Sequence, residues 1–216
     1  MKKLVLEFLS RLEENNTREW FQANKELYTE AKLEVESFVN LIIPEIARFD
    51  ESIRYVEAKD CMFRIFRDVR FSKDKTPYRT SMGASIAAGG RKSGRMAYYL
   101  HLEPQNQSMI AGGLYKPEPE QITRFRDSVS LDPVPFKSII SDPAFKQHFG
   151  GLQGEKLKTT PKGFAPDHPE IELIRLKEVV AIHTFTDAEV ITGDFTGHIV
   201  EAFTALKPFL DFLNNI

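Results

Sequence analysis

The side chains best suited to chemistry lie close together in one basic segment. Residues 59–95 carry ten basic and three acidic side chains, whereas residues 1–58 and 96–216 are both net negative. The hydrogen-bond donors of the segment include Arg64, Arg67, Arg70, Lys73, Lys75 and Tyr78. Arginine forks donate two parallel hydrogen bonds and suit phosphate or carboxylate groups. The segment therefore predicts a local site for a small anionic, phosphate-bearing ligand.

The same residues are also compatible with a structural role. Asp68 and Asp74 could pair with neighbouring arginines and lysines and so brace a long loop. On a regular strand Arg64 would point away from Arg67, so the arginines share a face only where the backbone bulges or enters a loop. Ligand binding and bracing both stay open here, and neither excludes the other.

Two groups could make such a site catalytic. Asp68 lies among the arginines, and His101 shares a strand face with Tyr99 and Glu103. A histidine beside a carboxylate is a suitable general base, and arginines stabilise developing negative charge. An enzyme that uses Asp68 or His101 as acid or base is therefore the alternative function. A nucleic-acid-binding protein is a weaker alternative, because acidic segments flank the basic one.

No metal site or cofactor is predicted. The five histidines are scattered, and the single cysteine, Cys61, lies in an apolar stretch where a thiol behaves as a small hydrophobe. The glycines at positions 89, 90 and 94 lack the following helix that a nucleotide phosphate requires. We interpret residues 162–169 as a turn, although Asp167 or His168 could act as an acid or base in a cleft.

The single cysteine and the lengths of the apolar stretches indicate the cellular compartment of the protein. One cysteine cannot form an intramolecular disulfide and suits a reducing compartment. No uncharged apolar run has the length of a membrane helix, and the N-terminal residues lack a signal-peptide cleavage pattern. We therefore expect a cytoplasmic protein with no membrane partner, and the sequence leaves its oligomeric state open.

The elements that must position these residues are helices and strands in mixed order. Helical spacing predicts a first helix from Leu4 that stops at Asn15, and then a long helix over residues 17–43 that Asn16 and Glu19 cap. Helices are also predicted over residues 119–130, 136–140 and 143–149, and at the C-terminus over residues 194–213. Strand patterns occur at residues 52–58, 61–67, 82–88, 96–103, 107–111 and 179–185.

These elements predict a single α+β domain over residues 1–216. We expect an antiparallel sheet of about five or six strands, with the long N-terminal helix and the C-terminal helix on one face. Within residues 96–103, Tyr98, Leu100 and Leu102 should face the core. Tyr99 and His101 should face solvent or a cleft together with residues 64–80, which we call the arginine segment.

The arginine segment resembles the signature of a family of conserved hypothetical proteins of bacteria and fungi, domain of unknown function 2461. The signature has the form R-x-x-R-D-x-R-F followed by D/N-K-x-x-Y. Its places are filled here by Arg64, Arg67, Asp68, Arg70, Phe71, Asp74, Lys75 and Tyr78. Residues 8–21, 98–104 and 160–169 also look like the family, so the resemblance covers nearly the whole chain. It implies a shared fold, and it supplies no catalytic residues.

Overall fold

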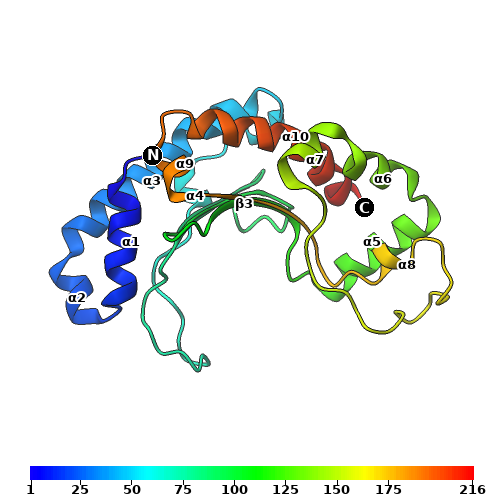
Figure 1. The fold of residues 1–216 in the computed structure, drawn as a ribbon, viewed down its shortest axis with the longest axis horizontal. Helices are drawn as coiled ribbons and strands as arrows, with labels where there is room; N and C mark the ends of the chain where they lie inside the picture. Colours follow the sequence, from blue (N-terminus) through cyan, green and yellow to red (C-terminus); the bar gives the residue numbers. More distant parts are fainter. The chain divides into compact units, whose positions relative to one another are not determined.

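The α+β chain contains a four-stranded antiparallel sheet in the order β1-β2-β3-β4 (Figure 1). The computed structural model describes residues 1–216. The strands are β1 (Met82–Ile86), β2 (Tyr98–Leu102), β3 (Ser108–Leu114) and β4 (Val179–Phe185). The first helices are α1 (Leu4–Glu14), α2 (Arg18–Ala23), α3 (Lys25–Ala47), the 3-10 helix η1 (Glu51–Ile53) and α4 (Ala58–Cys61). The others are α5 (Pro119–Leu131), α6 (Val134–Ser141), α7 (Pro143–Phe149), α8 (Ile171–Ile174), α9 (Asp187–Ile191) and α10 (Phe195–Asn215).

The chain divides into two compact units. The first comprises residues 1–110 and 184–200, and the second comprises residues 111–183 and 201–216. The whole arginine segment, β1 and β2 belong to the first unit. A single domain over residues 1–216 stays a prediction. No helix in the structure combines the length and the apolar character that spanning a membrane requires.

In the first unit, α3 packs against α1 and β1. Apolar residues at helical spacing on α1 and α3 are fully buried, among them Leu9, Leu12, Val35 and Ile42. Burying such a side chain contributes about 1.5–3 kcal/mol. These contacts hold the sheet and the N-terminal helices together and thereby fix the place of the arginine segment.

Strand β2 has the two faces that its sequence predicts. Tyr98, Leu100 and Leu102 are buried, whereas Tyr99 and His101 are half-buried on the other face. Strands β1 and β2 are antiparallel, and the register places Gly83 opposite His101. The predicted division of this strand is therefore confirmed.

The N-terminal helices differ from the prediction at two positions, Asn24 and Asn16. The long N-terminal helix is present as α3. The prediction of one continuous helix over residues 17–43 is wrong, because Asn24 separates α2 from α3. The Asn24 side chain donates a hydrogen bond to Trp20 O at 2.9 Å, which satisfies a carbonyl at the end of α2. Capping by Asn16 is also wrong: the cap is Thr17, whose Oγ1 accepts from Trp20 N at 3.2 Å. Asn16 instead forms two hydrogen bonds with the main chain of Tyr78.

The predicted count of five or six strands is wrong, because two apolar stretches form no regular strand. Residues 52–58 enter η1, where Asp50 Oδ1 accepts from Ser52 N at 3.1 Å and outweighs strand propensity. Residues 61–67 form only two isolated bridges, Met62 with Ala84 and Phe66 with Tyr78. Pro77 interrupts the partner segment and has no N–H to extend a ladder.

The second unit has its own aromatic core. Phe125, Phe136, Phe145 and Phe209 are at most 1% exposed, and their rings contact one another at centroid distances of 5.0–6.0 Å. The helices predicted over residues 119–130, 136–140 and 143–149 are confirmed as α5, α6 and α7, and the strand over residues 179–185 is β4. The predicted C-terminal helix is present as α10.

Candidate functional site

The arginine segment is a long loop held between two short extended stretches. Phe63 N donates to Gly83 O at 3.0 Å, and Arg67 N donates to Pro77 O at 2.9 Å. Arg79 N completes the pairing by donating to Ile65 O at 2.8 Å. Residues 68–76 lie between these stretches and contain three of the six predicted ligand-binding side chains, Arg70, Lys73 and Lys75.

Two aspartates hold this loop from within. Asp74 pairs with the Arg67 Nη1 group and accepts from Thr76 N at 2.9 Å, and Arg67 Nη1 also contacts Thr76 Oγ1. The hydrogen bond from the Thr76 backbone, reinforced by Arg67, lowers the pKa of Asp74 to about 2. Asp68 accepts both arms of the Arg70 fork, Nε at 3.0 Å and Nη2 at 2.7 Å. This fork lowers the pKa of Asp68, so both aspartates are ionised at neutral pH.

The six predicted donors fall into three groups. Arg70 is engaged by Asp68, and Lys75 Nζ donates to Val69 O at 3.0 Å, so these two side chains brace the loop. Arg64 and Lys73 are exposed and make no hydrogen bond or ion pair with their side chains. The structure does not gather all six side chains around one point. Only Arg67 and Tyr78 line the same cleft.

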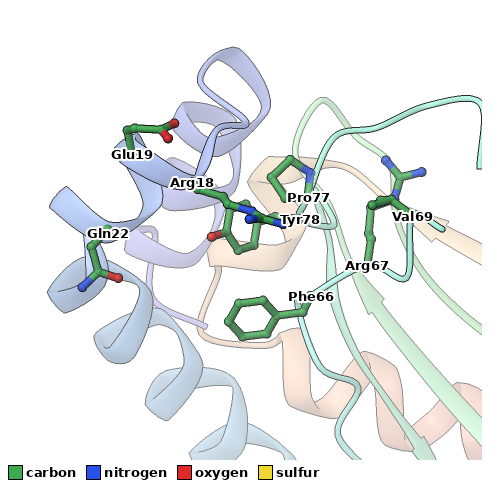
Figure 2. Close-up of a pocket in the computed structure, with 8 residues that line it drawn as sticks. All are labelled: Arg18, Glu19, Gln22, Phe66, Arg67, Val69, Pro77 and Tyr78. Atoms are coloured by element: carbon green, nitrogen blue, oxygen red, sulfur yellow. The ribbon is translucent and has the colours of Figure 1, made fainter.

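That cleft lies between α2 and the arginine segment and has a volume of about 570 Å³. We call it the α2 cleft. Its lining consists of Arg18, Glu19, Gln22, Phe66, Arg67, Val69, Pro77 and Tyr78. In Figure 2, Glu19 and Gln22 lie on one side of the Phe66–Tyr78 pair and Arg67 lies on the other.

The floor of the α2 cleft is an aromatic cluster. The Tyr78 ring stacks on Phe21 at a centroid distance of 3.9 Å, and Phe66 lies 5.4 Å from Tyr78. Phe66 is 49% exposed although both of its ring neighbours are buried. The backbone of Tyr78 is fixed by Asn16, which donates to Tyr78 O at 3.0 Å and accepts from Tyr78 N at 3.1 Å. The floor is therefore rigidly attached to the start of α2.

Sequence reasoning missed Arg18 and Phe66 as lining residues. Arg18 is exposed and its side chain makes no hydrogen bond or ion pair. It lies outside the basic segment, so charge counting along the chain does not find it. The available signal was its position within residues 8–21, one of the stretches that resemble the family.

A second network of polar side chains lies on the half-buried face of β2. Tyr99 Oη lies 3.0 Å from His101 Nδ1, and His101 Nε2 lies 2.7 Å from Glu103 Oε2. Thr80 Oγ1 donates to Glu103 Oε1 at 3.2 Å. Asp68 and His101, the two predicted acid–base candidates, therefore belong to separate hydrogen-bond networks. An ionised Asp68 held by Arg70 is poorly suited to proton transfer near neutral pH.

All of these residues lie in the part of the chain that one family model matches. That model describes conserved hypothetical proteins, DUF2461, and it matches residues 4–212. The chain belongs to the DUF2461 family. Comparison with curated proteins and with solved structures finds no match. The predicted family resemblance is thereby confirmed.

The remaining candidates in this DUF2461 chain have structural partners. His168 Nδ1 accepts from Glu170 N at 3.0 Å, so in the neutral ring the proton is on Nε2, which lies 2.9 Å from Ser130 Oγ. In that tautomer His168 donates to Ser130 and cannot serve as its base. Burial raises the pKa of Cys61 to about 11, so the thiol is protonated at neutral pH. No three histidine, cysteine, aspartate or glutamate side chains are grouped to hold a metal ion.

Proposed function

We propose that this DUF2461 protein binds a small ligand that joins an anionic group to an aromatic ring, and that the ligand occupies the α2 cleft. The observation that carries the proposal is the pairing of Arg18 and Arg67 with the exposed ring of Phe66 in one cleft. Pockets of several hundred Å³ with a few polar groups and aromatic walls are typical small-ligand sites.

Two arginines can provide the anion-binding half. The Arg18 side chain has no partner, and Arg67 uses its Nη1 group for Asp74 and Thr76, which leaves Nε and Nη2 for a ligand. The Arg67 side chain is 25% exposed and held in place by Asp74, so it is preorganised to donate. Glu19 lies across the cleft from Arg67 and would repel the anionic end of a ligand (Figure 2). The ligand should therefore place its anionic group toward Arg67.

The aromatic half of the ligand would contact Phe66. The ring of Phe66 is about half exposed, and Tyr78 and Phe21 support it from below. Stacking on an exposed, supported ring buries apolar area and adds about 0.5–1.5 kcal/mol beyond that area for an aromatic partner. An anion without a ring would forgo this contact and should bind more weakly.

The other predicted residues have supporting roles in this proposal. Arg70 and Lys75 hold the loop, and the exposed charges of Arg64 and Lys73 raise the local concentration of anions. An enzyme that acts on an anionic ligand at a site separate from the α2 cleft is the second candidate. The observation that favours it is the hydrogen-bonded pair of His101 and Glu103, since Asp68 is engaged by Arg70.

A thermal-shift series tests the proposal. Phenyl phosphate, inorganic phosphate and a short oligonucleotide would be added to the wild type, to Arg18→Ala and to Arg67→Ala. Arg70→Ala is the matched control because Arg70 does not line the cleft, and its exposed pair with Asp68 is separate from the Asp74 and Thr76 contacts that hold Arg67. Phenyl phosphate at 100 times its dissociation constant should stabilise the wild type by about 2.7 kcal/mol, or roughly 5 to 10 °C.

The variants determine how this series is interpreted. The shift should persist in Arg70→Ala and disappear in the two cleft variants, provided that they remain folded. A shift with the oligonucleotide alone would favour nucleic-acid binding, which we do not expect. No shift with any anion, or an equal loss in Arg70→Ala, would refute binding in the α2 cleft.

A further inference from the structure

Tyr99 and His101 of β2 and Glu103, the residue that follows the strand, occupy alternate positions and form a continuous chain of hydrogen bonds. The Glu103 carboxylate can only accept, so in the neutral imidazole the proton is on Nε2 and points to Glu103. His101 Nδ1 is then an acceptor, and the Tyr99 hydroxyl donates to it across 3.0 Å. A hydroxyl, a base and a carboxylate that orients the base are the parts of a nucleophilic triad.

The chain of hydrogen bonds is held firmly at its carboxylate end. Glu103 Oε1 accepts from Thr80 Oγ1 at 3.2 Å. Its backbone is fixed by Ser108, whose Oγ accepts from Glu103 N at 3.1 Å and donates to Glu103 O at 2.9 Å. The His101 side chain is 15% exposed and that of Glu103 is 32% exposed. The imidazole is therefore oriented by a fixed, partly buried partner and is screened from most of the solvent.

The neighbours of the triad include an aromatic ring and a positive charge. Gly83 is paired with His101 in the register of β1 and β2, and it lies so close to the Leu100 carbonyl that an added Cβ would come within 2.5 Å of Leu100 O. The Phe63 ring meets the Tyr99 ring edge to face at 6.1 Å and is 40% exposed. The Arg91 guanidinium lies over Phe63 at 5.7 Å. A substrate with an apolar part and an anionic group would match these neighbours.

We propose that Tyr99 is a nucleophile that His101 activates and Glu103 orients, and that it accepts the acyl group of an activated ester carrying an anionic group. The Tyr99 oxygen forms a bond to the ester carbonyl carbon while its proton moves to His101 Nδ1. The ester C–O bond then breaks, and His101 returns the proton to the leaving oxygen. Water can release the acyl group from Tyr99 by the same steps. This site does not share lining residues with the α2 cleft, so the proposal stands independently of ligand binding there.

The test uses acylation of the folded protein by p-nitrophenyl acetate and by mono-p-nitrophenyl succinate. Acylated tyrosines are located and timed by mass spectrometry of peptides. Tyr55 and Tyr115 are internal controls, because they are 89% and 67% exposed. Tyr99 should react faster than either control despite its half-buried position, by about 100-fold if His101 acts as a general base. The succinate ester should acylate it faster than the acetate ester.

Variants separate activation from simple accessibility. His101→Asn should bring Tyr99 down to or below the rates of Tyr55 and Tyr115, and Tyr99→Phe should abolish labelling at that position. Glu103→Gln can still accept from His101 Nε2 but lacks the counter-charge, so the rate at Tyr99 should fall about tenfold or more. Acylation of Tyr99 no faster than that of the exposed tyrosines in the wild type would overturn the proposal. So would a folded His101→Asn variant that keeps the full excess rate.

Discussion

Asn16 and Tyr78 are joined by two hydrogen bonds between the asparagine amide and the tyrosine main chain. Asn16 Nδ2 donates to Tyr78 O at 3.0 Å, and Tyr78 N donates to Asn16 Oδ1 at 3.1 Å. The side chain thus replaces a strand partner for a residue that follows Pro77. It attaches the end of the arginine segment to the start of α2, and both walls of the α2 cleft depend on this attachment.

Replacing Asn16 should therefore destabilise the fold. Asn16→Ala leaves the Tyr78 N–H and C=O without partners, at a cost of about 1–3 kcal/mol in the free energy of unfolding. Urea denaturation followed by circular dichroism measures it. Asn15→Ala is the matched control, since Asn15 makes one exposed hydrogen bond to Arg11 O. Equal losses in the two variants would show that the attachment to Tyr78 contributes little.

Truncation of Phe21 in the aromatic floor should destabilise the fold, whereas truncation of the exposed Phe71 should not. Phe21 is 5% exposed and contacts four other aromatic rings, so Phe21→Ala should cost about 3–5 kcal/mol. Phe71 is 95% exposed, and Phe71→Ala should change stability by no more than about 0.5 kcal/mol. Thermal and urea unfolding of the Phe21→Ala and Phe71→Ala variants measures both changes in stability. A large loss in Phe71→Ala would mean that the loop packs differently.

The Asp74 carboxylate should titrate well below the usual range. The hydrogen bond from Thr76 N and the interactions with Arg67 and the Thr76 hydroxyl lower its pKa from 3.8 to about 2 in the folded protein. Because the folded pKa is lowered, its stabilising effect is complete above about pH 4 and is lost as the pH falls toward 2. Carbon-13 NMR of the Asp74 carboxyl measures the midpoint directly. A midpoint near 4 would show that Asp74 does not hold Arg67 in solution.

Gly113 in the second unit should not tolerate a side chain. Its φ is +122°, and an added Cβ would lie 2.1 Å from Val179 O. Gly113→Ala should therefore cost at least about 2 kcal/mol. Gly151→Ala provides the comparison, because a Cβ there meets no atom within 4 Å. If both variants unfold at the wild-type temperature, the close approach of these two chain segments is not present in solution.

Local patterns predicted the elements that local interactions determine. The α+β class, the faces of β2 and most helix ends follow from spacing, capping and proline positions. The failures involve contacts between distant residues. Asn16 looks like a helix cap, but its partner Tyr78 is 62 positions away. Residues 61–67 have strand composition, yet they pair with a segment that Pro77 interrupts, so only isolated bridges form.

The candidate site was predicted only in part, because it too depends on contacts between residues that are distant in sequence. Charge counting found the segment that contains Arg67 and Tyr78, but it could not show that Arg70 pairs with Asp68 or that Lys75 binds a carbonyl. Arg18 belongs to a helix far from the basic segment in sequence. Its place in the α2 cleft depends on tertiary structure alone.

Calorimetric titration of phenyl phosphate tests the central claim most directly. The wild type, an Arg18→Ala, Arg67→Ala double variant and the Arg70→Ala control would be titrated under identical conditions of salt and pH. Binding in the α2 cleft predicts one site in the wild type and in Arg70→Ala. It also predicts affinity at least about tenfold weaker in the folded double variant, equivalent to about 1.4 kcal/mol. Equal affinity in all three proteins, or no heat in the wild type, would contradict it.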